Sequence, residues 1–77
     1  MGAWIKKADT QIHHEVLEEL KWDPRVDETE IGVEVDDGVV TLTGSVGSLA
    51  ERRSVVGAAR STTGIRSVED HLRIEPL

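Results

Sequence analysis

The sequence predicts a small α+β domain, in which two helices cover one face of a three-stranded mixed sheet in the order αββαβ. The segment from Ile31 to Val46 alternates apolar and polar residues on both sides of Asp37-Gly38, a pattern typical of a hairpin with a type I′ turn. Apolar residues recur at helical spacing before and after this segment. Because an isolated hairpin is marginally stable in water, its apolar face needs such helices as a cover.

The N-terminal part of the chain is expected to form a tail over residues 1–8, because it shows no periodic pattern. Trp4 in this tail either folds back onto the domain or stays mobile. A single domain is expected over residues 9–75.

The net charge of -6 comes from 15 acidic against 9 basic side chains and disfavours nucleic acid as a partner. The same charge weakens nonspecific attraction to an anionic membrane.

The first helix is predicted from Asp9 to about Trp22, since Pro24 disfavours helical geometry just before it. Asp9 or Thr10 is expected to cap its N-terminus by accepting a hydrogen bond from a backbone amide. Trp22 is expected to close the end of the core against Val26. The apolar stripe of this helix recurs every fourth residue and consists of Ile12, Val16 and Leu20, with Leu17 beside them.

The second helix is predicted after Ser48, which together with Glu51 has the spacing of a capping box. It is expected to run to about residue 62 or 63, with Gly64 in a left-handed conformation at its end. Gly57 inside the helix costs about 1 kcal/mol relative to alanine, and a close backbone approach would explain it. The buried stripe of this helix is expected to contain Val55, Ala58 or Ala59, and Thr62.

The third strand is predicted from Ser67 to Ile74, parallel to the second strand through a right-handed crossover. Asp70 falls on its inward parity and is expected to be a structural carboxylate that accepts bonds from backbone amides at the sheet margin. The second strand carries neither proline nor charge and should be central. The covered face is expected to carry Ile31, Val33, Val35, Val40, Leu42, Val68, Leu72 and Ile74. The opposite face is expected to be solvated, with Glu34, Val39, Thr41, Thr43, Glu69, His71 and Arg73.

Catalytic and metal chemistry find little support in the residues. The chain has no cysteine, and neither a Ser-His-Asp arrangement nor a phosphate-binding glycine loop can be placed. His13 and His14 are adjacent and point about 100° apart on a helix, and His14 with Glu18 supplies two ligands where zinc needs three or four. We therefore expect no enzyme, no metal and no cofactor.

The outer side of the second helix is the best candidate for a binding surface. It combines aliphatic and cationic side chains at helical spacing, which suits a lipid headgroup or a protein partner. The alternative is a solvated face with two scattered aliphatic residues. The candidate contact residues are Leu49, Arg52, Arg53, Val56 and Arg60.

The order of elements and several motifs resemble the BON domain family, which is named after an osmotically inducible periplasmic protein and nodulation proteins. The resemblance runs from Asp9 to Ile74. It rests on the strand IGVEV, the run DGVVTLTG, the ERR start of the second helix and the later Gly64-Ile65 with Val68 and Asp70-His-Leu72. BON domains are usually bacterial periplasmic or envelope modules, often in tandem, and have no catalytic residue set.

This resemblance implies a non-catalytic module for phospholipid, a membrane surface or an envelope partner, in an osmotic or stress context. The alternative is a protein-interaction or oligomerisation module without lipid affinity, pairing for example through an exposed strand edge. The start of the chain has no hydrophobic signal-peptide segment, and no apolar run approaches a membrane span. As written, the chain is expected in the cytoplasm, and in the periplasm or envelope if it is excised from a longer precursor.

Overall fold

The predicted order of elements is confirmed by a computed structural model, which describes residues 8–75. The expectation for Trp4 lies outside these residues. A short 3-10 turn before the first strand was not predicted. The elements are α1 (Asp9–Lys21), η1 (Glu28–Glu30), β1 (Ile31–Asp36), β2 (Val39–Val46), α2 (Leu49–Ser61) and β3 (Ser67–Ile74).

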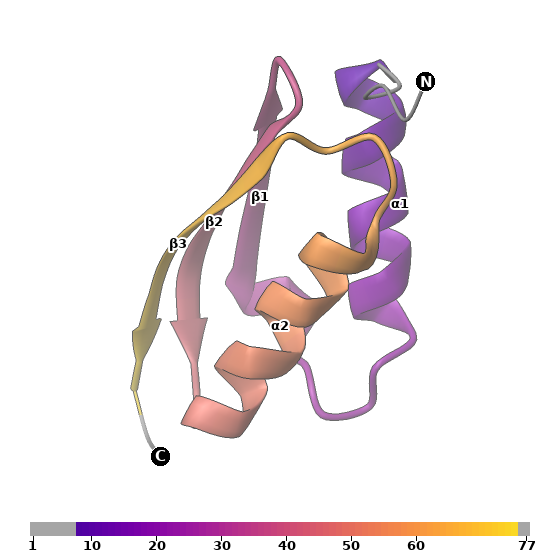
Figure 1. Cartoon of the computed structure of the whole chain (residues 1–77). Helices are drawn as coiled ribbons and strands as arrows, with labels where there is room; N and C mark the ends of the chain where they lie inside the picture. The colour runs from indigo at the N-terminus through magenta and orange to yellow at the C-terminus, as the bar shows by residue number, and fades with distance from the viewer. Residues whose placement is uncertain (1–7, 76–77) are drawn as a thin grey trace.

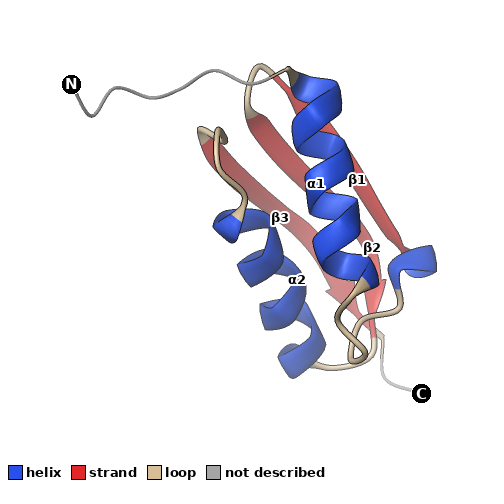
Figure 2. Ribbon diagram, turned by 90° about the vertical axis from the view of Figure 1, so that its right-hand side faces the viewer, coloured by secondary structure: helices blue, strands red, loops and turns tan. Residues whose placement is uncertain are grey.

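The sheet has the order β1-β2-β3, with β2 in the centre as expected. β2 runs antiparallel to β1 and parallel to β3, so the sheet is mixed. Both helices lie on one face of the sheet, α1 over β1 and α2 over β3, as Figures 1 and 2 show from two directions. Within the described residues, neither helix is long and apolar enough to cross a membrane.

The β1-β2 turn has the conformation that its sequence predicts, with φ of 52° at Asp37 and 79° at Gly38. The carboxylate of Asp9 accepts hydrogen bonds from the backbone N–H groups of both turn residues, at 3.0 Å and 3.1 Å. The predicted cap of α1 by Asp9 or Thr10 is therefore wrong. Ala8 occupies the N-cap position without a side-chain bond, and the Asp9 carboxylate serves the hairpin turn instead.

The core is aliphatic and lies between the two helices and the sheet. The predicted stripes of both helices are buried, and Val40 and Leu42 of the central strand are fully buried. The parity of the hairpin is therefore confirmed. The buried apolar residues are Ile12, Val16, Leu20, Val26, Ile31, Val33, Val40, Leu42, Val46, Val55, Ala59 and Leu72. Most residues of the opposite sheet face are exposed, with Val39 and Thr41 half-buried.

Two residues expected in the core are exposed. Trp22 was expected to pack against Val26, but it is 78% exposed. At about 100° per residue, position 22 lies 200° around the helix axis from Leu20, so its side chain leaves the buried stripe. Ile74 is 41% exposed, because it is the last residue of β3 and this strand is an edge of the sheet.

The start of α2 has half of the predicted capping box. Ser48 Oγ accepts the N–H of Glu51 at 3.1 Å, as expected. The reciprocal bond is different, since the Glu51 carboxylate accepts the N–H of Gly47 at 2.8 Å and that of Asp27 at 3.1 Å. Glu51 thus also ties the segment before η1 to this helix. The helix ends at Ser61, and Gly64 has the predicted positive φ, at 87°.

Candidate functional site

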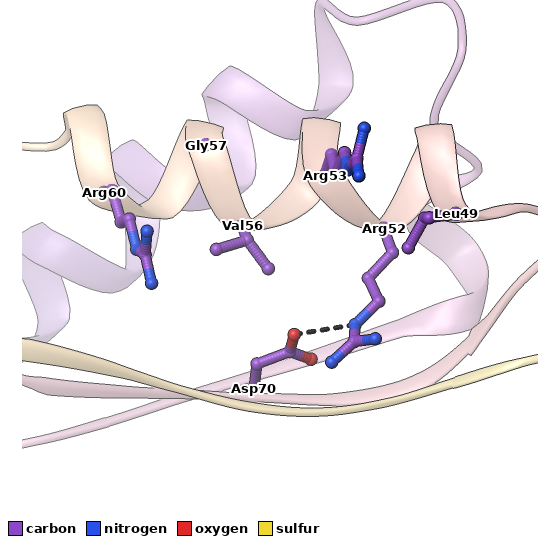
Figure 3. Close-up of a pocket in the computed structure, with 7 residues that line it drawn as sticks. All are labelled: Leu49, Arg52, Arg53, Val56, Gly57, Arg60 and Asp70. Carbon is purple, nitrogen blue, oxygen red and sulfur yellow. Dashed lines mark hydrogen bonds and ion pairs between the residues drawn. The ribbon is translucent and has the colours of Figure 1, made fainter.

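A groove runs along the outer side of α2, between this helix and the edge strand β3. Its volume is about 350 Å³. All five contact residues expected from the sequence line it, and the structure adds a glycine and a carboxylate (Figure 3). We call this feature the α2 groove, and its lining residues are Leu49, Arg52, Arg53, Val56, Gly57, Arg60 and Asp70.

Helical periodicity brings these residues together. Val55 and Ala59 mark the direction of the core, and both are fully buried. Arg52 lies three positions before Val55, and Val56 and Arg60 each lie one position after a residue of this stripe, so all three point to the same side of the helix, toward the margin of the sheet. Val56 is half-buried and packs against the core, whereas Leu49 is 47% exposed. The groove therefore has an apolar wall that the chain itself leaves partly open to solvent.

An ion pair with β3 fixes the position of Arg52. Its Nε donates to Oδ2 of Asp70 at 2.8 Å, and the two side chains are 39% and 24% exposed. The other carboxylate oxygen of Asp70 accepts the backbone N–H of Leu72 at 3.0 Å. Figure 3 shows Arg52 reaching from the helix to Asp70 on the strand. The predicted amide bond to Asp70 is thus present, and it is accompanied by a link to the helix.

The surroundings of Asp70 favour its charged form. Partial burial acts to raise its pKa, but the hydrogen bonds from Leu72 and Arg52 and the charges of Arg52 and His71 outweigh this effect. The pKa of Asp70 therefore lies below its ordinary value of 3.8. At neutral pH the carboxylate offsets the charge of Arg52 and holds its guanidinium at the groove wall.

The other two arginines of the groove have no such partner. Within residues 8–75, neither Arg53 nor Arg60 forms an ion pair or a side-chain hydrogen bond, and both are exposed. Because Asp70 offsets one of three arginines, the α2 groove keeps an excess of positive charge in a protein with a net charge of -6. Free guanidinium groups of this kind bind phosphate or carboxylate oxygens, often in a bidentate manner.

Sequence reasoning missed the part of Asp70 in this site. The two partners are 18 residues apart on different elements, and helical spacing alone does not connect them. A usable signal was present, since Asp70 has the inward parity of β3 and Arg52 borders the inward stripe of the crossover helix. A carboxylate on the inward side of a strand needs a cation or backbone amides as partners. Asp70 has a partner of each kind, the guanidinium of Arg52 and the N–H of Leu72.

The histidines do not gather into a site. His14 Nε2 lies 3.6 Å from Glu18 Oε1 on the exposed side of α1, and His71 Nε2 lies 3.3 Å from Glu69 Oε1 on β3. Among the residues that the structure describes, no group of three or more His, Cys, Asp or Glu side chains is arranged to hold a metal ion.

Comparison with known proteins identifies the domain. No curated protein matches the sequence significantly. Among solved structures, the fold is similar to a chain of CdsD, a structural protein of the type III secretion system of Chlamydia trachomatis, with a TM-score of 0.74 and 21% identity. The similarity covers 90% of this chain but only 32% of that chain. BON domains are typical of bacterial envelope proteins and are generally non-catalytic binding modules. The sequence model of the BON domain matches residues 8–76, and the chain therefore belongs to the BON domain family.

Proposed function

We propose that this chain is a non-catalytic binding module whose α2 groove holds the phosphate of a phospholipid headgroup at a membrane surface. The observation that carries the proposal is the pair of exposed arginines, Arg53 and Arg60, which lie beside partly open apolar side chains and lack a partner in residues 8–75. A location in the bacterial envelope and an osmotic or stress context are parts of this proposal and rest on the family.

The chemistry of the groove suits the boundary between headgroups and acyl chains. Guanidinium groups attract phosphate oxygens, and Leu49 and Val56 offer apolar area to the first methylene groups of a lipid. The excess positive charge is local, so it directs an acidic protein to approach an anionic surface with this side.

A protein partner is the second candidate, because carboxylate groups would also satisfy Arg53 and Arg60. CdsD, to which the fold is similar, is a structural protein of a secretion system. On this alternative the module joins an envelope assembly and has no lipid affinity. The two functions differ in their response to vesicles.

The test is a titration of the isotope-labelled chain with vesicles of phosphatidylcholine, with and without phosphatidylglycerol, followed by amide NMR signals. We expect anionic vesicles to perturb signals of residues 49–60, and the double variant Arg53→Glu with Arg60→Glu to abolish the effect. Arg73→Glu is the control for charge, because this exposed residue lies on β3 outside the groove. If no lipid composition perturbs residues 49–60, the lipid proposal is wrong and the protein alternative takes its place.

A further inference from the structure

A second surface of α2 combines an exposed tryptophan with a hollow. Trp22 follows the last residue of α1 and is 78% exposed, more than any other large apolar residue that the structure describes. Where α1 ends against α2, Trp22 borders a shallow hollow of about 490 Å³ that is wide open to solvent. Trp22 and Pro24 form one side of this hollow. The other side consists of small residues of α2, namely Ser54, Gly57, Ala58 and Ser61. We call this surface the Trp22 face.

The chain itself does not explain these features. An exposed indole leaves a large apolar area in water, although the hollow that could take an indole is adjacent. Gly57 weakens the interior of a helix relative to alanine, yet a Cβ atom at this position would meet nothing within 4 Å. The close backbone approach expected from the sequence is therefore absent within the chain. Both features have a use if another molecule covers this surface.

We propose that the Trp22 face is a homodimer contact, in which Trp22 of each copy inserts into the hollow of the other copy. A twofold contact requires that one patch be complementary to itself. The Trp22 face meets this requirement, because the projecting side chain and the hollow lie side by side on it. A rotation about an axis between them places each indole over the small residues of the partner.

The charges at the edge of the hollow agree with such a contact. Glu19 and Arg25 both lie on it and have opposite signs, so a twofold rotation can set Arg25 of one copy near Glu19 of the other. Asp23 also lines the hollow and is paired with Arg25 of its own chain at 3.4 Å, so the surface carries two acidic groups and one basic group. The basic group matters in a protein with a net charge of -6, because a uniformly acidic face would repel its own copy.

The contact is expected to be weak. Two inserted tryptophans bury about 300–500 Å², whereas stable interfaces bury about 1,200–2,000 Å² in total. The dimer should therefore form in a concentration-dependent way and exchange with the single chain. Tryptophan at the centre of a small interface is also the type of residue whose truncation has the largest effect.

Sedimentation equilibrium of the whole chain from micromolar to millimolar concentration tests the proposal. We expect the average mass to rise from that of one chain to that of two. Trp22→Ala and Ser61→Arg should each raise the dissociation constant at least tenfold. Ser61 is exposed, and within residues 8–75 its hydroxyl donates only to the carbonyl of Ala58 in its own helix, so this substitution fills the hollow without disturbing the core. Thr43→Arg adds the same charge on the exposed opposite face of the sheet and should leave the dimer unchanged.

Mixing the two variants gives the sharper test. The Trp22→Ala chain keeps the small residues of α2 on which an indole would rest, and the Ser61→Arg chain keeps its tryptophan, so an equimolar mixture can form one of the two insertions. The mixture should associate more tightly than either variant alone. A mixture that associates no better than the variants would overturn reciprocal insertion. So would a mass of one chain at every concentration, or a dimer that neither substitution weakens.

Fluorescence separates the dimer from a membrane contact. In a Trp4→Phe background, the emission of Trp22 should shift to shorter wavelength as the chain concentration rises in the absence of lipid. A shift that appears only when phosphatidylglycerol vesicles are added would overturn the dimer and assign the Trp22 face to the membrane. Because the α2 groove is tested by the amide signals of the Arg53→Glu and Arg60→Glu chain, failure of one proposal leaves the other intact.

Discussion

Arg52 on α2 and Asp70 on β3 form an ion pair, with 2.8 Å between Nε and Oδ2, that joins the second helix to the edge of the sheet. The pair has two consequences. It closes the margin of the core where β3 has no further strand beside it, and it holds one cation of the α2 groove in place. Stability and the proposed site therefore share this contact.

Asp70→Asn should lower the free energy of unfolding by about 1 kcal/mol at pH 7, because it removes the charge that pairs with Arg52. The magnitude is small since the pair is partly exposed. The pKa of Asp70 is lowered in the folded protein, so its contribution is fully present above the unfolded pKa and is lost as pH falls through the folded pKa. The difference between the two chains should therefore be constant above about pH 4, decrease as the pH falls further, and vanish only below the lowered pKa of the folded protein. Urea unfolding at a series of pH values measures it, and a difference independent of pH would contradict the assignment.

The same substitution should strengthen binding to anionic vesicles if the α2 groove is the lipid site. Asparagine removes the carboxylate that offsets Arg52, so the groove gains one unit of positive charge. Vesicle co-sedimentation with phosphatidylglycerol should show a severalfold lower dissociation constant than for the unmodified chain. Raising the salt concentration should reduce this gain, because screening weakens the added attraction. An unchanged or weaker affinity would place the lipid contact elsewhere.

Asp9→Ala should destabilise the protein by about 1–3 kcal/mol, because two backbone amides of the β1-β2 turn lose their acceptor. Thr10→Ala is a matched control, since this exposed neighbour caps neither the helix nor the turn. Its effect should stay within about 0.5 kcal/mol. Thermal and urea unfolding of both variants measure the difference. Equal effects of the two substitutions would indicate that the residues act through helix propensity and not through the turn.

The fold was predictable because local patterns agree with one another. The Asp37-Gly38 turn sets the hairpin, and the parity around it assigns Val40 and Leu42 to the core. The crossover rule then makes β3 parallel to β2, and the absence of charge in β2 makes it central. Each of these predictions depends on residues close in sequence or on a general rule of topology. None of them depends on an individual tertiary contact.

The wrong or incomplete predictions concern side chains whose position depends on how the elements pack in three dimensions. The Asp9 carboxylate could accept a hydrogen bond from an amide of its own helix or from the amides of a turn 28 residues away. The sequence does not show which of these amides lies closer to the carboxylate. Trp22 is apolar enough for the core, but the helical angle turns it outward. The α2 groove was predicted as a stripe on one helix, whereas its carboxylate comes from β3 and depends on how the two elements pack. Spacing along one element cannot supply that information.

Leu42→Ala should cost roughly 2–5 kcal/mol, since it truncates a fully buried side chain in the central strand. Thr43→Ala at the next position is the control, because its side chain is exposed on the other face of the sheet. A change within about 0.5 kcal/mol is expected there. Chemical unfolding of the two variants compares the faces directly, and a cost near zero at position 42 would contradict the observed parity.

Glycines in this chain should respond to alanine in opposite directions, according to their surroundings. Gly57→Ala should stabilise the protein by up to about 1 kcal/mol, because alanine is the better helix former and its Cβ atom would extend into open space. Gly44→Ala should instead cost roughly 1–3 kcal/mol, since its φ of 111° suits glycine and a Cβ atom there would collide with the carbonyl oxygen of Glu30. Thermal unfolding of both variants distinguishes the two cases. If Gly57→Ala were as destabilising as Gly44→Ala, position 57 would have to lie against a part of the molecule and not at an open surface. The face that we assign to a partner would then be occupied by the chain itself.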